Sequence, residues 1–475
     1  EVIDKSGKPV LVIKSGRTEE GASAAVSHTG SLSGRDEICD AAFRQAGMIR
    51  CDNIEEMFNK AVAFAYQPPP ASNRIAIITN AGGPGVLTTD AAISKGLQLS
   101  RFSEVTTKIL KRALPSTANI NNPVDVIGDA RADRYMAAIQ AAFEDDAVDG
   151  ILVILTPQSM TDIDTIAEEI ITIAKKYSKP IYTSFMGEKD VASGIAILQK
   201  NRIPHYILPE SMCSAFQSVY HFSQALKMRD HSYPEPDAIG KKEAGTRIKK
   251  ALSQGKSMLT EIEANEILRT YGLTVPEGGL ATSQEEAVEL AGKIGYPVVL
   301  KVVSDQIIHK SEARGVRLNL NSPAEVEEAY LLITDSAAAA FPDAALQGVY
   351  VVKMIAGGQE IITGIKRDPS FGPVLMFGLG GIFVEVLKDV SFGVAPVSYE
   401  QAREMIGQTR AYQILSGTRG HPPRDIESVI DTLIRLGYLA LDHPHIEELD
   451  INPLFVMEKE QGSFIGDARI ILNNS

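Results

Sequence analysis

A histidine in a loop of small residues is the first group in this sequence that could do chemistry. His28 stands in SGRTEEGASAAVSHTGSLSG, which runs from Ser15 to Gly34. Loops of more than about 12–15 residues without structure of their own are usually functional or mobile, and one rich in Gly, Ala and Ser moves at little cost. A neutral imidazole attacks phosphorus well near pH 7. His28 is therefore a candidate phosphoryl carrier, and a plain surface histidine is the alternative that the loop alone leaves open.

A glycine-rich segment, NAGGPG at 80–85, is the second candidate. It follows the apolar strand IAIIT and precedes a helical pattern, so the backbone N–H groups of Gly82, Gly83 and Gly85 would meet the positive end of a helix. Such a turn binds phosphate or phosphohistidine. An ordinary strand-to-helix connection explains it equally well. A further loop at 121–130, NNPVDVIGDA, is expected to face it at the edge of the sheet.

Cations gather later in the chain, after the buried strand VVLKVV. Lys301 lies on that strand, and His309 and Lys310 follow in the polar loop SDQIIHKSEARGV. Nucleotide phosphates need cations of this kind. Lys301 alone is equally compatible with a charge at a strand end.

Glycines and oxygen-bearing side chains complete this group. Glu360 lies on the strand EIITGIK, and Gly380 and Gly381 belong to FGLGG. Asn452 and Asp467, in ELDINPLF and GDARIIL, would offer hard oxygen ligands from neighbouring strands to Mg²⁺ held on ATP phosphates. The order and spacing of these motifs favour a nucleotide site over a set of unrelated turns.

Alternating strands and helices would position these groups. Residues 74–200 alternate in the manner of a parallel sheet covered on both faces, which predicts an α/β domain. From Leu259 the pattern changes to α+β, and 231–256 is polar with little periodicity, as in a linker. We expect domains at 1–68, 69–230 and 257–475, with the His28 loop in the first.

Composition excludes several classes of protein. The 475 residues exceed what one core organises, which predicts about three domains. A net charge of −13 argues against a nucleic-acid partner. No apolar run reaches the roughly 18 residues that span a membrane, and the first residues, EVIDKSGKPV, lack the pattern of a signal peptide. Three cysteines without C-x-x-C spacing fit a reducing compartment, so we expect a cytoplasmic protein.

These motifs together resemble those of the ADP-forming acyl-CoA synthetases, relatives of succinyl-CoA synthetase. SHTGSLSG is similar to the phosphohistidine loop of that family. VVLKVVSDQIIHKSEARGV, FGPVLMFGLGGIFVEVLKDVSFGVAPVS and LDINPL…DARI are similar to its ATP-grasp domain. The resemblance implies flavodoxin-like, succinyl-CoA-synthetase-like domains followed by an ATP-grasp domain.

The resemblance also implies an acid–thiol ligase that converts acyl-CoA, ADP and phosphate to carboxylate, CoA and ATP through phosphorylated His28. Lys301, Lys310, Glu360, Gly380 and Gly381 would bind nucleotide. Asn452 and Asp467 would hold Mg²⁺, Gly82, Gly83 and Gly85 would steady the phosphohistidine, and His309 would be a second relay. Partners would be a carboxylate, CoA and ATP or ADP, in a homodimer of fused chains or a heterotetramer.

Two features depart from the family pattern. The chain starts at Glu1 and opens almost directly into PVLVI, so we expect it to be part of something longer. It contains neither the family's N-terminal CoA-binding domain nor the glutamate that orients the histidine, and Arg314 stands where a glycine is more usual. A noncatalytic acyl-CoA sensor of a protein lysine acetyltransferase, and an ATP-grasp ligase without a histidine relay, are the alternatives.

Overall fold

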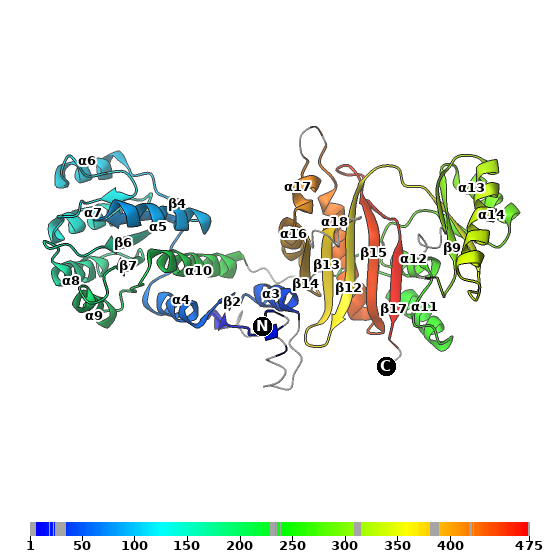
Figure 1. The fold of residues 1–475 in the computed structure, drawn as a ribbon, viewed down its shortest axis with the longest axis horizontal. Coiled ribbons are helices and arrows are strands. Elements are labelled where there is room, and N and C mark those ends of the chain that lie inside the picture. Colours follow the sequence, from blue (N-terminus) through cyan, green and yellow to red (C-terminus); the bar gives the residue numbers. More distant parts are fainter. Residues whose placement is uncertain are drawn as a thin grey trace. The chain divides into compact units, whose positions relative to one another are not determined.

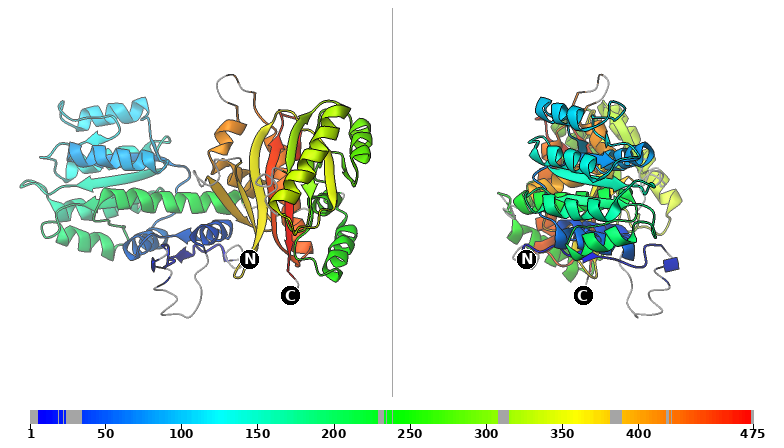
Figure 2. Two further views of the ribbon diagram at one scale, coloured as in Figure 1. Left: turned by 45° about the vertical axis from the view of Figure 1, so that its right-hand side comes forward. Right: turned by 90° about the vertical axis from the view of Figure 1, so that its left-hand side faces the viewer.

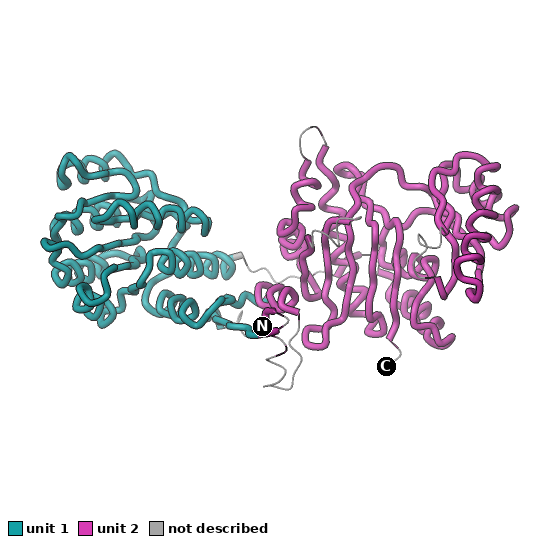
Figure 3. Tube along the Cα trace, in the orientation of Figure 1, with its two compact units in different colours: residues 1–15, 46–230 teal, residues 16–45, 231–475 magenta. Residues whose placement is uncertain are grey.

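The computed structural model describes residues 6–18, 20, 21, 23, 35–228, 233, 235–237, 239–307, 315–380, 389–417, 420 and 422–473. The chain divides into two compact units (Figure 3). Unit 1 comprises Glu1–Ser15 and Ala46–Asp230, and unit 2 comprises Gly16–Gln45 and His231–Ser475. No helix in the described part of the chain is both long and apolar enough to cross a membrane.

A five-stranded parallel sheet forms the centre of unit 1. Its path is β4-β3-β6-β7, and β5 pairs with the other end of β3. The strands are β3 (Arg74–Thr79), β4 (Gln98–Leu99), β5 (Val124–Asp125), β6 (Gly150–Leu155) and β7 (Ile181–Phe185). Strands β3, β6 and β7 are almost wholly buried, as expected for a sheet covered on both faces.

Helices cover both faces of this sheet (Figures 1 and 2). One core is formed with α6 (Glu104–Ala113), α7 (Ala132–Glu144), α8 (Ile163–Ala174) and α9 (Ala192–Lys200). The opposite core is formed with α4 (Ile54–Tyr66), α5 (Gly82–Ser94) and α10 (Pro209–Met228). A two-stranded parallel pair, β1 (Leu11–Val12) and β2 (Ile49–Arg50), completes the unit. The predicted α/β class is confirmed.

Unit 2 contains a six-stranded antiparallel sheet. Its path is β14-β13-β12-β15-β16, and β17 pairs with β15. The strands are β12 (Gln359–Asp368), β13 (Gly372–Leu379), β14 (Val390–Val394), β15 (Ile446–Val456), β16 (Ser463–Ile465) and β17 (Ala468–Leu472). One face packs against α11 (Lys241–Ser253), α12 (Glu261–Thr270), α16 (Tyr399–Gly407), α17 (Ala411–Leu415) and α18 (Ile426–Asp442).

A smaller four-stranded antiparallel sheet, β10-β9-β11-β8, forms the other part of unit 2. Its elements are β8 (Gly278–Ala281), β9 (Val298–Val303), β10 (Val316–Leu320) and β11 (Gly348–Lys353), with helices α13 (Gln284–Ile294) and α14 (Pro323–Ala340) on one face. Ser283 caps α13 by accepting a hydrogen bond from the N–H of Glu286, which satisfies one donor of the first turn. This α+β pattern is the one expected from Leu259 onward.

Two local expectations differ from the structure. The segment 231–256, expected to be a linker, contains helix α11, because Ala244, Ile248 and Ala251 recur at helical spacing and are buried in the unit 2 core. The glycines of NAGGPG, expected to form a turn before a helix, instead form the first turn of α5. Pro84 fits that turn, because the first residues of a helix need no N–H donor.

Candidate functional site

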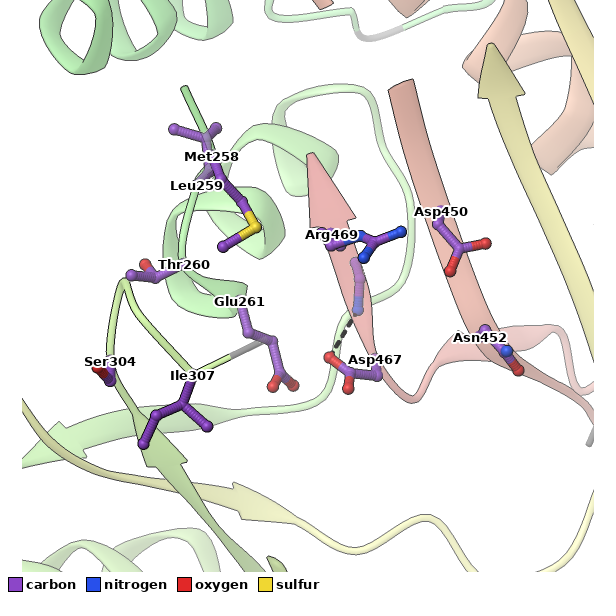
Figure 4. A pocket seen from close by; sticks show the side chains of 11 residues that line it. Met258, Leu259, Thr260, Glu261, Ser304, Ile307, Asp450, Asn452, Asp467 and Arg469 are labelled. Carbon is purple, nitrogen blue, oxygen red and sulfur yellow. Dashed lines mark hydrogen bonds between the residues drawn. The ribbon is translucent and has the colours of Figure 1, made fainter. Parts of the chain in front are cut away.

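A cavity of about 270 Å³ in unit 2 brings together side chains from several segments of the unit (Figure 4). It is lined by Met258, Leu259, Thr260, Glu261, Ser304, Ile307, Asp450, Asn452, Asp467, Ala468 and Arg469. The start of helix α12, the segment that follows β9 and strands β15 and β17 therefore surround one polar space. Asn452 and Asp467, which the sequence singled out, both line it.

Asn452 and Asp467 are held together by their strands. The backbone N–H of Asn452 donates to the carbonyl oxygen of Asp467 at 3.1 Å. One Asp467 carboxylate oxygen accepts from the N–H of Ala468 at 2.9 Å, which orients that side chain (Figure 4). An amide oxygen and a carboxylate are hard ligands, and Mg²⁺ usually takes one or two protein oxygens together with substrate phosphates and water. The two side chains therefore fit a magnesium ion that arrives with a nucleotide.

Lys301 is a buried side chain that does not line this cavity but contacts Glu261, which does. Its ammonium group donates to Glu261 Oε1 at 2.6 Å and to the carbonyl oxygen of Gly466 at 2.7 Å. Both side chains of the ion pair are at least nine-tenths buried. A buried ion without a partner is costly, so the contact with Glu261 is important for the stability of this site. Lys301 belongs to the four-stranded sheet, whereas both acceptors belong to the other part of unit 2. The hydrogen bonds of this ammonium group therefore link the two parts of the unit.

Sequence reasoning missed Asp450, Glu261 and Arg469. Asp450 lies two positions before Asn452 on β15, so the period of two places both side chains on one face. Asp450 lies opposite Arg469 in the antiparallel register of β15 and β17. Burial raises the pKa of Asp450 above its ordinary value, Arg469 opposes that rise, and Glu448 and Asp467 add to it. The alternation in LDIN was the signal that would have found Asp450.

Glu360 and Gly380 meet at a neighbouring place in the same sheet. The N–H of Gly380 donates to the carbonyl oxygen of Glu360 at 3.3 Å. A Cβ on Gly380 would lie 2.9 Å from the backbone carbon of Ile361, so only glycine fits there. Neither Glu360 nor Gly380 lines the cavity of Asn452 and Asp467, and their role in nucleotide binding stays a prediction.

The glycines of NAGGPG follow the carboxyl end of strand β3 in the parallel sheet of unit 1. Helix α5 has no side-chain cap at Ala81, and Gly82 and Gly83 in its first turn are exposed. A Cβ on Gly82 would lie 3.6 Å from a carboxylate oxygen of Asp125, so the loops at 80–85 and 121–130 are neighbours, as expected. The first N–H groups of a helix have no partner within the helix and can donate hydrogen bonds to an anion.

Four of the predicted site residues, His28, His309, Lys310 and Gly381, lie outside the described residues, as does Arg314. Among the described residues there is no group of three or more His, Cys, Asp and Glu side chains that could hold a metal ion.

Comparison with known proteins decides the family. Residues 250–472 match the model of an ATP-grasp domain, 75–228 a Ligase-CoA domain, and 1–64 a succinyl-CoA ligase like flavodoxin domain. The chain is 40% identical over 474 residues to the ADP-forming 4-hydroxybutyrate–CoA ligase of Nitrosopumilus maritimus, covering 99% of this chain and 67% of that protein. The chain belongs to the ADP-forming acyl-CoA ligase family.

Further members of this family show its range of chain organisation. The ADP-forming acetate–CoA ligase of Methanocaldococcus jannaschii is 44% identical over 478 residues, covering 98% of this chain and 67% of that protein. The beta subunit of the ADP-forming acetate–CoA ligase I of Pyrococcus furiosus is 51% identical over 225 residues, covering 47% of this chain and 96% of that subunit. The chain thus spans about two thirds of the longer relatives, and family members occur as fused and as separate chains.

Proposed function

We propose that this chain carries the phosphoryl-transfer part of an ADP-forming acyl-CoA ligase, acting on acyl-CoA, ADP and phosphate to give a carboxylate, CoA and ATP. Phosphate attacks the thioester carbonyl and CoA leaves, which gives an acyl phosphate. The imidazole of His28 then attacks phosphorus and releases the carboxylate. ADP attacks phosphohistidine in the last step, which regenerates neutral His28 and gives ATP.

The observation that carries this proposal is the cavity lined by Asn452, Asp467 and Glu261, the last of which forms a buried ion pair with Lys301. Transfer of a phosphoryl group needs positioned positive charge around the phosphate oxygens and little covalent chemistry from the protein. Lys301 supplies a buried ammonium, and Asn452 and Asp467 supply the oxygens for Mg²⁺, which neutralises charge on the phosphates when bound. The cavity lies within the residues that match the ATP-grasp model.

Other roles from the sequence extend the proposal. Lys310, Glu360, Gly380 and Gly381 complete the nucleotide site, His309 is a second relay, and the first turn of α5, with Gly82, Gly83 and Gly85, receives phosphohistidine at the acyl-transfer site. The uncapped N–H groups of that turn support the last assignment. We also propose a cytoplasmic assembly, either a homodimer of fused chains or a heterotetramer.

Labelling with γ-³²P-ATP and Mg²⁺ tests the proposal. The wild-type chain should gain label that is labile in acid and stable in base, which is the signature of phosphohistidine. His28→Ala should abolish this label. His309→Ala should lower the rate of labelling while leaving His28 able to accept the group.

Binding of Mg·ATP, measured by titration calorimetry on the same samples, separates the outcomes. A wild-type chain that binds Mg·ATP and gains no label would contradict the relay and favour a sensor of acyl-CoA. Label that persists in His28→Ala would place the phosphoryl group on another residue.

A further inference from the structure

Helix α3 (Asp36–Gln45) follows the His28 loop in sequence and packs in unit 2 against strand β14 (Figure 1). The family match at 1–64 assigns this helix to the flavodoxin-like domain, together with α4. In the structure, however, α3 belongs to the unit that contains the nucleotide cavity, whereas α4 belongs to unit 1. Something on α3 must therefore hold it against the sheet of unit 2.

The side chain of Gln45 makes four hydrogen bonds to the rest of unit 2. Its Nε2 donates to the carbonyl oxygens of Val394 at 2.6 Å and Pro396 at 3.1 Å. Its Oε1 accepts from the N–H of Val394 at 2.9 Å. The same Nε2 lies 3.4 Å from Oε1 of Gln401. One amide thus pairs with both backbone groups of a single residue, as a strand residue does in an antiparallel ladder.

The place of these contacts explains why an amide is used. Strand β14 is at the edge of the six-stranded sheet, and its neighbour β13 pairs with only one side of it. The N–H of Ala395 donates to Pro373 beside β13, so the N–H and C=O of Val394 point away from the sheet. Unpaired edge groups bind any chain that offers a matching donor and acceptor. Gln45 offers both.

The start of α3 lies beside a second cavity of unit 2. Arg35 and Ile38 line this cavity of about 320 Å³ with Met376, Phe392 and Asp450. Asp450 also lines the cavity of Asn452 and Asp467, so the two cavities share one residue of their linings. His28 is eight positions before Asp36 in the sequence.

We propose that Gln45 is a positioning residue, whose amide fastens α3 to the edge of β14 and so ties the helix that follows His28 in sequence to the unit that contains the nucleotide cavity. This inference rests on the proposed function of His28. An ion pair between Arg44 and Glu404, at 3.5 Å and largely exposed, adds little to the fastening. The Gln45 amide is the specific contact, because its three backbone partners fix both the position and the direction of the helix end.

Two substitutions separate hydrogen bonding from packing. Gln45→Leu keeps a side chain of similar size and removes all donors and acceptors. Gln45→Glu keeps the shape but places a carboxylate against the carbonyl oxygens of Val394 and Pro396. The matched control is Gln140→Leu, which is the same Gln-to-Leu substitution at an exposed position of α7. All are made in the 475-residue chain.

Both Gln45 variants should transfer phosphate from γ-³²P-ATP in a single turnover at least tenfold more slowly than wild type. Their Kd for Mg·ATP should stay within about twofold, because Gln45 does not line the nucleotide cavity. Backbone amides of residues 36–45 should exchange hydrogen faster. Gln140→Leu should match wild type in all three measurements.

Labelling at the wild-type rate in Gln45→Leu would overturn the proposal while leaving the proposed function intact. So would a Gln45→Glu variant that behaves as wild type, since the donor contacts would then contribute nothing. If the wild-type chain itself binds Mg·ATP without gaining label, the proposed function fails instead. In that case hydrogen exchange alone tests whether Gln45 holds α3 against β14. Unchanged protection of residues 36–45 in Gln45→Leu would contradict this role of Gln45.

Discussion

At the scale of single residues, the ion pair of Lys301 and Glu261 is the contact with the largest expected effect. Glu261→Ala would leave a buried ammonium without its carboxylate, and breaking one partner of such a pair costs about 3–5 kcal/mol. We expect a loss of stability in that range in the absence of nucleotide. Mg·ATP should stabilise this variant more than it stabilises wild type, because phosphate oxygens replace the lost charge.

Chemical denaturation with and without Mg·ATP measures both effects. Glu289→Ala, which breaks an exposed pair with Lys293 on α13, is the control and should change stability by less than about 0.5 kcal/mol. An equal gain from Mg·ATP in wild type and Glu261→Ala would show that Lys301 does not meet the phosphates.

The paired oxygens of Asn452 and Asp467 lead to a second prediction at this scale. Asp467→Asn keeps the size of the side chain and removes the charge that a hard cation prefers. Binding of ATP should become at least tenfold weaker in the presence of Mg²⁺ and change little in EDTA. Calorimetric titrations in both buffers measure this, with the exposed Asp335→Asn as control. Equal weakening with and without Mg²⁺ would contradict a metal site.

Sequence reasoning reached those site residues whose chemistry is visible in local motifs. The type and spacing of Asn452 and Asp467 singled them out, and the structure brings them together in one cavity. Glu261 could not be found in this way, because it lies 40 positions before Lys301 and only the fold makes them neighbours. The role of each residue as a ligand stays a prediction.

At the scale of elements, helix α5 allows a test of the glycine-rich turn. A Cβ on Gly83 would meet nothing within 4 Å, whereas one on Gly85 would lie 3.0 Å from the Thr79 side chain. Alanine stabilises an open helical position by about 0.5–1 kcal/mol relative to glycine. Gly83→Ala should therefore raise the stability of unit 1. Gly85→Ala should raise the stability by a smaller amount or lower it, because its methyl group meets Thr79.

Thermal denaturation of the two glycine variants checks this. A stabilised Gly83→Ala chain that also binds inorganic phosphate more weakly in a calorimetric titration would indicate that the exposed glycine is kept for the close approach of an anion. Unchanged phosphate binding in Gly83→Ala would show that this glycine is used only for backbone conformation.

Elements were predictable where periodicity was strong and local. The strands at 74–79, 150–155 and 298–303 and helix α8 follow directly from apolar runs and periodic patterns. Helix α11 was missed because its exposed face, rich in lysine, outweighs three buried apolar positions in the composition. Its stability comes from packing against the unit 2 core, which the sequence does not display.

At the scale of the whole molecule, the two compact units are not continuous in sequence, because unit 2 includes residues 16–45 as well as 231–475. The sequence groups the helix at 36–45 with residues 1–68, yet the structure places it in unit 2, through the contacts of Gln45. No local pattern could show this, because an amphipathic helix specifies that a face is buried and not which surface buries it. The boundaries of the domains at 1–68, 69–230 and 257–475 remain a proposal.

Two units with separate cores should unfold in two thermal transitions. A ligand that binds only the folded form adds about 2.7 kcal/mol at a hundred times its Kd. Because the cavity of Asn452 and Asp467 lies wholly in unit 2, Mg·ATP should raise one transition and leave the other in place. Calorimetry, with hydrogen exchange to assign each transition, measures this, and Asp467→Asn should abolish the shift. A single transition that moves as a whole would instead mean that the units unfold cooperatively, so that nucleotide binding in one unit stabilises the glycine-rich turn in the other.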